Sequence, residues 1–408
     1  MAVFWIGLYI FVNLTSIIWL GSIAVNQVAG VDQDVALIGL GLFALLYQLK
    51  GGLKAVALTD IVQVTLLVFG GLCVSAITLS RIGGEAGVIG GFSRLMTEAP
   101  GHFDMILSPD NPFYKDLPGL SVLIGGMWIA NLSYWGFNQY IIQRALAAKN
   151  LGEAQKGIVL AAFLKLLMPF VIVLPGIAAV MLAPDLAKPD QAYPMMMQLL
   201  PPGLLGLVFA ALIAAIIAST ASKINSIATI FTLDLYAKGK HTVTKAEDGR
   251  ATDPATERRL VMVGRIAAAV SIVVAMLAAR PLLGQSDQAF QYIQEYTGFF
   301  TPGITVIFLL GLFWRGATEA GALAAAIASF ALSLLLKYAL PDFPFMNRMV
   351  VVFLAALALA VIVSLLRPQP AAANRIVTND VGYATPTSFN IAAAGVIAIL
   401  IAFYAAWW

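Results

Sequence analysis

The feature that most constrains the fold is a series of long apolar stretches that recurs from one end of the chain to the other. A bilayer crossing by an α-helix needs about 20 mainly apolar residues, and each stretch is close to that length. The chain is 60% hydrophobic and 11% charged, whereas soluble domains carry about 25% charged residues. The short alternating segments of a membrane β-barrel are absent from the sequence. The sequence therefore predicts an all-α polytopic membrane protein with the lipid bilayer around it.

We expect about eleven transmembrane helices. Lysine and arginine are more frequent in the connections that would face the cytoplasm if the N-terminus lies inside. We therefore expect a multi-pass protein of the plasma membrane (a bacterial inner membrane), with its N-terminus in the cytoplasm and its C-terminus outside. The expected spans are 2–25, 33–49, 56–80, 119–144, 155–183, 203–226, 260–281, 288–314, 319–340, 346–366 and 389–407.

Two longer connections separate these spans, and neither carries a nucleotide-binding or metal motif. Residues 81–118 contain several prolines and acids and are expected to form an ordered cap outside the membrane. Residues 237–259 are polar and charged and are expected to be a mobile cytoplasmic connection. The single cysteine, Cys73, lies in an apolar run, and the two histidines do not cluster. No disulfide or thiolate metal site is expected, and no nucleic-acid partner is indicated.

The stretch from Gly125 to Arg144, GGMWIANLSYWGFNQYIIQR, carries polar and aromatic residues inside an apolar span. Asn131, Tyr134, Trp135 and Asn138 follow the spacing i, i+3, i+4, i+7, which places them on one helical face. An amide both donates and accepts hydrogen bonds, while tyrosine and tryptophan offer flat apolar faces with a polar edge. Amides beside aromatic planes suit a neutral polyol, so this stripe indicates one wall of a sugar site.

A second polar face runs along the span that begins near residue 203. Ala215, Ser219, Ser222 and Ser226 follow i, i+4, i+7, i+11. Small hydroxyl residues of this kind allow close helix packing in a membrane. The alternative is that Ser219, together with backbone carbonyls, coordinates a small cation that prefers oxygen ligands. The pattern leaves both interpretations open.

Three ionisable residues lie within spans, and two of them have both a structural and a functional interpretation. Lys165 lies deep in its span, where an ionisable group is a functional candidate, although backbone carbonyls or a cytoplasmic cavity would also hold it. Lys223 is closer to the cytoplasmic end of its span and is expected to extend toward that interface. Asp60, in GGLKAVALTDIVQ, is either a carboxylate stabilised near a helix N-terminus or a station on a cation path.

The span that begins near residue 288 opens with QAFQYIQEYTGFFTPG. Phe290, Gln294, Thr297 and Thr301 share a face of the expected helix. Pro302 has no backbone N–H to donate, which leaves a carbonyl near Gly298 without its helical partner. A bend is therefore expected there. A buried glutamine requires hydrogen-bond partners, which either a hydroxylated ligand or a neighbouring helix would supply.

Several of these blocks together resemble the sodium/solute symporter family, and most strongly its bacterial sodium/galactose and sodium/glucose members. The resemblance extends from Met1 to Trp408. It rests on GGLKAVALTDIVQ, WIANLSYWGFNQYIIQR, AAFLKLLMPF, the Ser219 segment ending in FTLDLY, and FQYIQEYTG, which occur in the family's order. The family fold is LeuT-like, with two inverted five-helix repeats around a substrate and a sodium ion near the midplane.

The resemblance implies roles for residues already singled out. Asn131, Lys165 and Gln294 match sugar-binding positions. Tyr134 is similar to the aromatic residue that stacks on the sugar and closes the inner gate, with Trp135 beside it, and Phe290 matches an outer-gate aromatic. Ala215, through its carbonyl, and Ser219, through its hydroxyl, match the sodium site, and Asp60 matches a carboxylate on the sodium path.

Two positions depart from the galactose members of the family. Ala218 stands where they have a further hydroxyl at the sodium site, so fewer ligands would hold the ion. Ser133 stands where they have a second tyrosine beside the gate. The family also begins with three helices before the one that starts here, so the resemblance implies an N-terminally truncated fold. The implied divisions are 1–80 (rest of the first repeat), 81–118 (extracellular loop), 119–316 (second repeat) and 317–408 (three peripheral helices).

The function that the resemblance implies is sodium-coupled sugar symport by alternating access, with Na+ as the transported ion and a small sugar as the co-transported substrate. A fragment without the first helices is expected to be inactive on its own. The alternatives are a symporter of the same family for another solute and a non-transporting sensor or interaction protein derived from a symporter. An intramembrane enzyme is not indicated, because HExxH, GxSxG and paired-carboxylate motifs do not occur in the spans.

Overall fold

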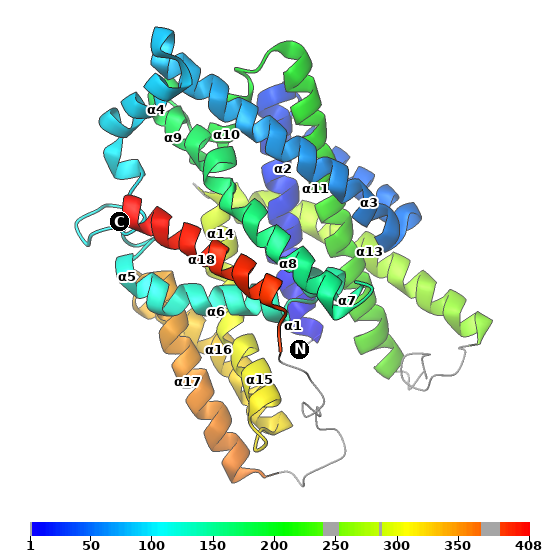
Figure 1. Cartoon of the computed structure of the whole chain (residues 1–408). Coiled ribbons are helices and arrows are strands. Elements are labelled where there is room, and N and C mark those ends of the chain that lie inside the picture. Colours follow the sequence, from blue (N-terminus) through cyan, green and yellow to red (C-terminus); the bar gives the residue numbers. More distant parts are fainter. Residues whose placement is uncertain (1, 240–252, 285–287, 369–383) are drawn as a thin grey trace. The chain divides into compact units, whose positions relative to one another are not determined.

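The protein is described here from a computed structural model that covers residues 2–239, 253–284, 288–368 and 384–408 (Figure 1). Within these ranges the chain is helical, with no strand. It forms two compact units, each built from two stretches of sequence. Unit 1 comprises Met1–His102 and Leu167–Ile293, and unit 2 comprises Phe103–Leu166 and Gln294–Trp408.

Unit 1 contains the long helices α3 and α11, which pack against each other along their length. The Asp32 carboxylate caps α3 by accepting the backbone N–H groups of Asp34 and Val35. Its helices are α1 (Ala2–Gly7), π-helical η1 (Leu8–Leu14), α2 (Thr15–Ala29), α3 (Gln33–Gly83), η2 (Gly84–Ala86), α4 (Gly87–Glu98), η3 (Pro100–His102), η6 (Pro169–Val173), α9 (Leu174–Leu182), η7 (Pro189–Gln191), α10 (Ala192–Met197), α11 (Pro202–Ile230), η8 (Phe231–Ala237) and α13 (Pro254–Leu283).

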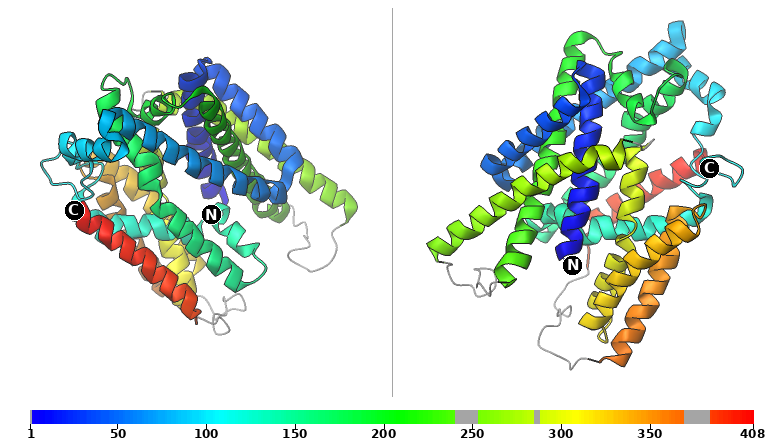
Figure 2. Two further views of the ribbon diagram at one scale, coloured as in Figure 1. Left: turned by 45° about the horizontal axis from the view of Figure 1, so that its top comes forward. Right: turned by 180° about the vertical axis from the view of Figure 1, so that it is seen from behind.

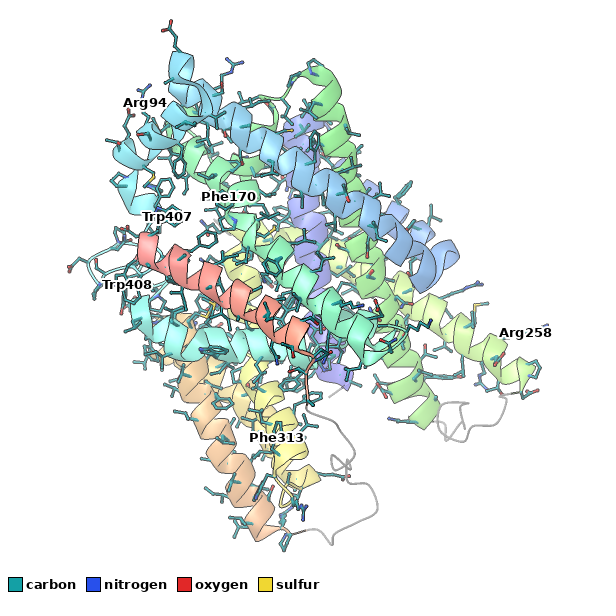
Figure 3. All side chains as sticks on the ribbon, in the orientation of Figure 1. Arg94, Phe170, Arg258, Phe313, Trp407 and Trp408 are labelled. Atoms are coloured by element: carbon teal, nitrogen blue, oxygen red, sulfur yellow. The ribbon has the colours of Figure 1, made fainter. Side chains whose placement is uncertain are left out.

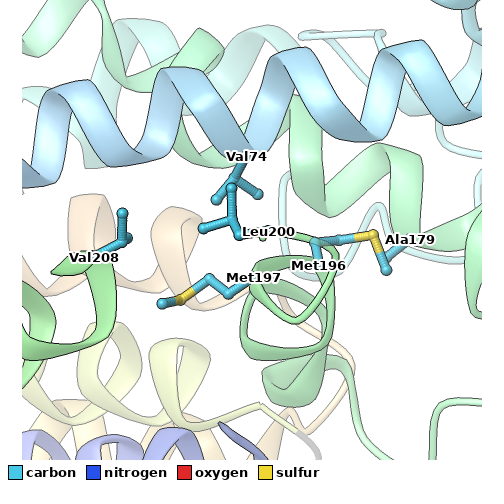
Figure 4. Close-up of a cluster of buried hydrophobic side chains, with 6 residues drawn as sticks. All are labelled: Val74, Ala179, Met196, Met197, Leu200 and Val208. Atoms are coloured by element: carbon cyan, nitrogen blue, oxygen red, sulfur yellow. The ribbon is translucent and has the colours of Figure 1, made fainter. Parts of the chain in front are cut away.

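The core of unit 1 joins α3 to helices that follow more than a hundred residues later. Figure 4 shows its six buried side chains, which come from α3, α9, α10, α11 and the short connection between α10 and α11. Glycine allows this approach, because a Cβ on Gly70 would lie 2.6 Å from Cγ2 of Val208. The cluster consists of Val74, Ala179, Met196, Met197, Leu200 and Val208.

Unit 2 contains a group of three adjacent helices, α15, α16 and α17, seen side by side in Figures 1 and 2. Buried alanines and Val306 fill the space between them. Ser329 of α16 bridges the start of α15, since its hydroxyl donates to the Phe299 carbonyl and accepts the Gly303 N–H. The unit's helices are α5 (Gly119–Ser121), η4 (Val122–Gly126), α6 (Met127–Leu132), η5 (Ser133–Phe137), α7 (Gln139–Leu146), α8 (Leu151–Leu166), α15 (Thr301–Phe313), α16 (Glu319–Ala339), α17 (Phe345–Leu366) and α18 (Thr387–Ala406); α14 (Ala289–Thr297) runs across the division between the units.

The chain's last residues pack against the loop that precedes α5, within unit 2. The Met105 N–H donates to the Trp407 carbonyl at 2.9 Å, and the Phe103 and Trp407 rings stack with centroids 6.4 Å apart. Figure 3 labels Trp407 and Trp408 at the end of α18, and Trp408 remains 63% exposed. The indole of Trp407 is thus used in packing rather than presented to the surroundings.

The prediction of a polytopic helical protein is confirmed. In the part of the chain that the structure describes, nine helices are long and apolar enough to cross a membrane, or ten if one bent pair counts as a span. That pair is α14 and α15, bent by 40° between Thr297 and Thr301. The bend lies at Gly298, as predicted from Pro302. The expected span 33–49 corresponds to a shorter apolar helix, Gln33–Leu49.

The expected spans 33–49 and 56–80 both lie within the bounds of α3, as the apolar helix Gln33–Leu49 and the candidate span Asp60–Glu98. One expected boundary was wrong. The span 119–144 was expected to be one helix, but it ends at Phe137, because Asn138 adopts an extended conformation with φ −90° and ψ 114°. Asn138 is 4% exposed, and its carbonyl accepts the N–H groups of Ile141 and Ile142 at the start of α7. Asn138 therefore ends the polar stripe instead of extending it.

Candidate functional site

Asn131 lies at the end of α6 and is bonded at both ends of its amide to its own helix. Its Nδ2 donates to the Met127 carbonyl at 2.9 Å, and its Oδ1 accepts the Trp135 indole N–H at 3.2 Å. The next segment, Ser133–Phe137, is π-helical, which widens the turn and changes the direction of the side chains that follow. A ligand that binds Asn131 would therefore exchange these local bonds for its own.

Trp135 is the centre of a small aromatic cluster in unit 2. The Tyr134 and Trp135 rings meet edge to face, with centroids 5.1 Å apart and an interplanar angle of 82°. Both side chains are partly open, at 38% and 45% exposure. From α8, the Lys165 ammonium lies 4.5 Å from the centroid of the Trp135 ring. The structure therefore brings together four of the predicted site residues, from the three helical elements α6, η5 and α8: an amide, two aromatic faces and a cation.

Gln294 is half-buried on α14, and among the described residues no hydrogen bond involves its side-chain amide. Its helix is held at the N-terminal end by Asp190 of unit 1, whose Oδ2 accepts the Ala289 N–H at 2.9 Å. Burial raises the pKa of Asp190, while this hydrogen bond and the nearby charge of Lys188 lower it. The Gln294 amide is therefore a donor and acceptor available on a helix whose start is fixed.

Glu295, the residue after Gln294, forms a cluster of ion pairs that was not predicted from the sequence. The Glu295 carboxylate accepts Lys337 Nζ of α16 at 3.0 Å and Arg348 Nη2 of α17 at 2.5 Å. Lys337 also donates to the Tyr296 hydroxyl at 3.2 Å and lies 4.3 Å from the centroid of that ring. The Arg348 side chain is only 8% exposed. The cluster fixes the end of α14, next to Gln294, against two helices of unit 2.

The predicted sodium residues lie in unit 1, one turn apart on α11. Ala215 and Ser219 are both half-buried, and Ala218 beside them is 3% exposed. Further along the same helix, Gln48 of α3 donates to Asn225 Oδ1 at 2.8 Å. The α11 face thus presents the backbone carbonyl of a small residue and, one turn later, a hydroxyl. Both are oxygen ligands of the kind that a hard cation takes.

The expectation for Lys223 was wrong. It does not extend to an interface, because the residue is 3% exposed and its Nζ donates to Asn13 Oδ1 at 2.9 Å. The ammonium also lies 4.8 Å from the centroid of the Tyr9 ring. Its position four residues after Ser219 indicates the same helical face, and that spacing was visible in the sequence.

The other two predicted residues also belong to unit 1. Asp60 is half-buried within α3, and Phe290 is 60% exposed at the start of α14. Unit 1 therefore carries the predicted sodium residues and the outer-gate aromatic, while unit 2 carries the predicted sugar residues.

These residues define the class of protein. It is a polytopic helical membrane protein with one broken span and with polar, aromatic and hydroxyl side chains on the faces of its apolar helices. The chain belongs to the sodium:solute symporter family, whose model matches residues 1–329. It is 47% identical over 429 residues to a sodium/glucose cotransporter of Vibrio parahaemolyticus, covering 100% of this chain and 76% of that protein.

More distant relatives and one solved structure agree with this family. Sodium/myo-inositol cotransporter 2 of Sus scrofa is 33% identical over 362 residues, covering 82% of this chain and 52% of that protein. The chain therefore spans three quarters of the Vibrio relative and about half of the myo-inositol relative. The fold is similar to that of a Na+-coupled sialic acid symporter solved in a substrate-bound outward-open state, with a TM-score of 0.69 and 22% identity over 90% of this chain and 72% of that one. The symporter fold predicted from the sequence is thus confirmed.

Proposed function

We propose that the protein is a sodium-coupled sugar symporter that works by alternating access, and not an enzyme. The observation that carries the proposal is the group formed by Asn131, Tyr134, Trp135 and Lys165, where an amide, two aromatic faces and an ammonium converge. A pyranose offers hydroxyls to the polar groups and an apolar C–H face to the rings. The name of the Vibrio relative supports the same substrate class.

In this proposal Asn131, Lys165 and Gln294 bind sugar hydroxyls, and Tyr134 stacks on the ring and closes the inner gate beside Trp135. Phe290 closes the outer gate. The Ala215 carbonyl and Ser219 hydroxyl bind Na+, and Asp60 lies on the path by which the ion leaves. Sodium stabilises the outward-open state, sugar binds, the aromatics occlude it, and both leave inward. Inward sodium movement supplies about 2.3 kcal/mol per charge per 100 mV.

The proposed organisation follows the inverted repeats of the fold. Residues 1–80 belong to the first repeat, 81–118 form the outer loop, 119–316 form the second repeat, and 317–408 add peripheral helices. The chain's N-terminus lies in the cytoplasm and its C-terminus outside a bacterial inner membrane. The match covers 76% of the Vibrio relative. Transport is therefore proposed for the whole protein.

The test is uptake of labelled glucose and galactose into proteoliposomes, with an inward Na+ gradient or with choline in its place. We expect uptake only with sodium. Lys165→Ala should raise the sugar concentration for half-maximal uptake at least tenfold. The matched control is Lys156→Ala on the same helix. The Lys156 side chain is 77% exposed in its pair with Glu153, so this variant should leave uptake unchanged. Sodium-independent uptake, or equal effects of the two variants, would contradict the proposal.

A related polyol is the second candidate substrate, because the Sus scrofa relative is a myo-inositol cotransporter. The same assay separates the two by competition: unlabelled myo-inositol should inhibit sugar uptake weakly if a pyranose is the substrate and strongly if a cyclitol is. Gln294→Ala should lower the apparent affinity for the preferred solute more than for the other, since the amide is proposed to hydrogen-bond hydroxyls at particular positions. Absence of uptake for every solute would favour a sensor or interaction protein instead.

A further inference from the structure

Lys223 is a cation inside unit 1 that the proposed transport cycle does not use. It lies on α11, within the helical span Pro202–Ala237, and is 3% exposed. A charged group buried in the protein interior is costly unless neighbouring groups compensate it. The groups that hold this ammonium therefore call for an explanation.

The Lys223 ammonium is held by Asn13 and Tyr9, which lie on the first helices of the chain and together form the Lys223 seat. Asn13, in the π-helical segment η1, donates its Nδ2 to the Leu8 carbonyl at 3.3 Å, which leaves Oδ1 directed at Lys223 Nζ, 2.9 Å away. Tyr9 is fully buried, and its ring centroid lies 4.8 Å from the ammonium. An amide oxygen and an aromatic face are both good partners for a cation. The seat holds the charge in one place.

The position of that charge matters because of the helix that carries it. Lys223 follows Ser219 by four residues and Ala215 by eight, so the three share one face of α11. Helical side chains lean toward the N-terminal turn, which directs Lys223 back toward Ser219. A fixed positive charge therefore stands on the same face as the oxygen ligands proposed for sodium.

We propose that Lys223 is a built-in cation that weakens sodium binding at Ala215 and Ser219 and so sets the affinity of the coupling site. This inference rests on the proposed function of those two residues. Two unit charges about 10 Å apart, at an effective dielectric constant of about 20, repel enough to lower an affinity on the order of tenfold. A weakened site releases its ion readily, which suits the inward-facing step of a symporter.

The experiment measures the Na+ concentration for half-maximal sugar uptake by the full protein. Lys223→Met, which keeps the side chain's length without its charge, should lower that concentration about tenfold and leave the sugar dependence at saturating sodium unchanged. The control is Lys238→Met, which removes a charge at the end of the same helical segment from an exposed pair with Asp234. It should change neither quantity. A folded, sugar-transporting Lys223→Met with unchanged or weaker sodium affinity overturns the inference.

A second variant decides the matter if Lys223→Met does not fold. Asn13→Asp keeps the lysine and neutralises it in place, since the new carboxylate would face the ammonium at the position of Oδ1. It should also lower the sodium concentration for half-maximal uptake, and no change would overturn the inference. Ser219→Ala separates the two hypotheses. If it leaves sodium dependence intact, the proposed sodium site fails; if it weakens sodium while both Lys223 tests show no shift, only the role of Lys223 fails.

Discussion

The two units bury positive charge in different ways. In unit 2, Lys337 and Arg348 share one partner of opposite charge, the Glu295 carboxylate. In unit 1, Lys223 is seated on the amide oxygen of Asn13 and the face of Tyr9. The Glu295 cluster of unit 2 compensates its cations with a full negative charge, whereas the Lys223 seat of unit 1 compensates its cation with an amide dipole and an aromatic face. This difference predicts where each unit can tolerate a change of charge.

A cluster of full charges depends on every member. Removing one partner leaves the others desolvated without compensation, whereas replacing a whole cluster by apolar residues is often tolerated. A dipolar seat loses one hydrogen bond when its acceptor is removed, and it can accommodate an apolar residue in place of the cation. We therefore expect the Glu295 cluster to be structural and the Lys223 seat to be adjustable.

The largest expected effect comes from Glu295→Ala, which removes the common partner of two cations. We expect a loss of about 3 kcal/mol in stability, at the lower end for a buried pair, because the Glu295 and Lys337 side chains keep 25% exposure. The measurement is the thermal unfolding midpoint in detergent at a fixed scan rate. Asp342→Ala is the control, since its pair with Lys115 is exposed and should cost at most about 1 kcal/mol. Equal shifts for the two variants would show that the cluster is not structural.

A smaller effect is expected from Asn13→Leu, which removes the acceptor of Lys223. The cost should be about 1–3 kcal/mol in the parent protein, because the ammonium loses its amide partner. In the Lys223→Met background the same substitution should cost less than about 1 kcal/mol, since no charge remains to be held. A double-mutant cycle on thermal unfolding measures this coupling. Identical costs in the two backgrounds would mean that the seat contributes nothing to holding the cation.

An exposed version of the lysine–aromatic contact tests how much burial contributes. Lys165 lies 4.5 Å from the Trp135 ring centroid, close to the 4.8 Å between Lys223 and Tyr9, but Trp135 is 45% exposed. Trp135→Leu should cost about 0.5–1 kcal/mol for the lost contact, with the bond to Asn131 adding a similar amount. Tyr9→Leu should cost more. The reverse order in thermal unfolding would break the argument that burial strengthens such contacts.

The sequence was sufficient for features that depend on neighbours along the chain. Apolar length predicted the spans, and Pro302 beside Gly298 predicted the bend between α14 and α15. The spacing of Asn131 and Trp135 predicted a shared face, and the two side chains do form a hydrogen bond. The end of the stripe could not be predicted, because the π-helical turn at Ser133–Phe137 departs from the 3.6-residue period that pattern reasoning assumes.

Features that depend on distant partners could not be predicted. Lys223 is held by Asn13, 210 residues earlier in the chain, and no local pattern links them. Glu295 finds its partners 42 and 53 residues later, on α16 and α17. In each case the lone charge in an apolar span was visible, but the partner that makes it tolerable came only from the packing. An ionisable residue within a span is therefore the best indication in a sequence of a contact still to be found.

The smallest expected effect concerns Asp116, which extends the Glu295 cluster into the loop before α5. Burial raises the pKa of Asp116 above its ordinary 3.8, the charge of Lys115 lowers it, and the charge of Glu295 raises it. A raised acid pKa means that the folded state binds the proton more tightly, so this group's contribution to stability falls as the pH rises above about 3.8. Asp116→Asn should therefore be slightly more stable than the parent at neutral pH.

The gain should stay within about 0.5 kcal/mol, because Asp116 is only partly buried and keeps much of its contact with water. It should disappear as the pH falls below the ordinary carboxyl value, where both states of the parent are protonated. Unfolding midpoints of the two proteins across that pH range provide the measurement. In the Glu295→Gln background the gain should be smaller, because one cause of the raised pKa is gone. An unchanged gain there would show that Asp116 does not respond to Glu295, and that the charge cluster of unit 2 ends at its three main members.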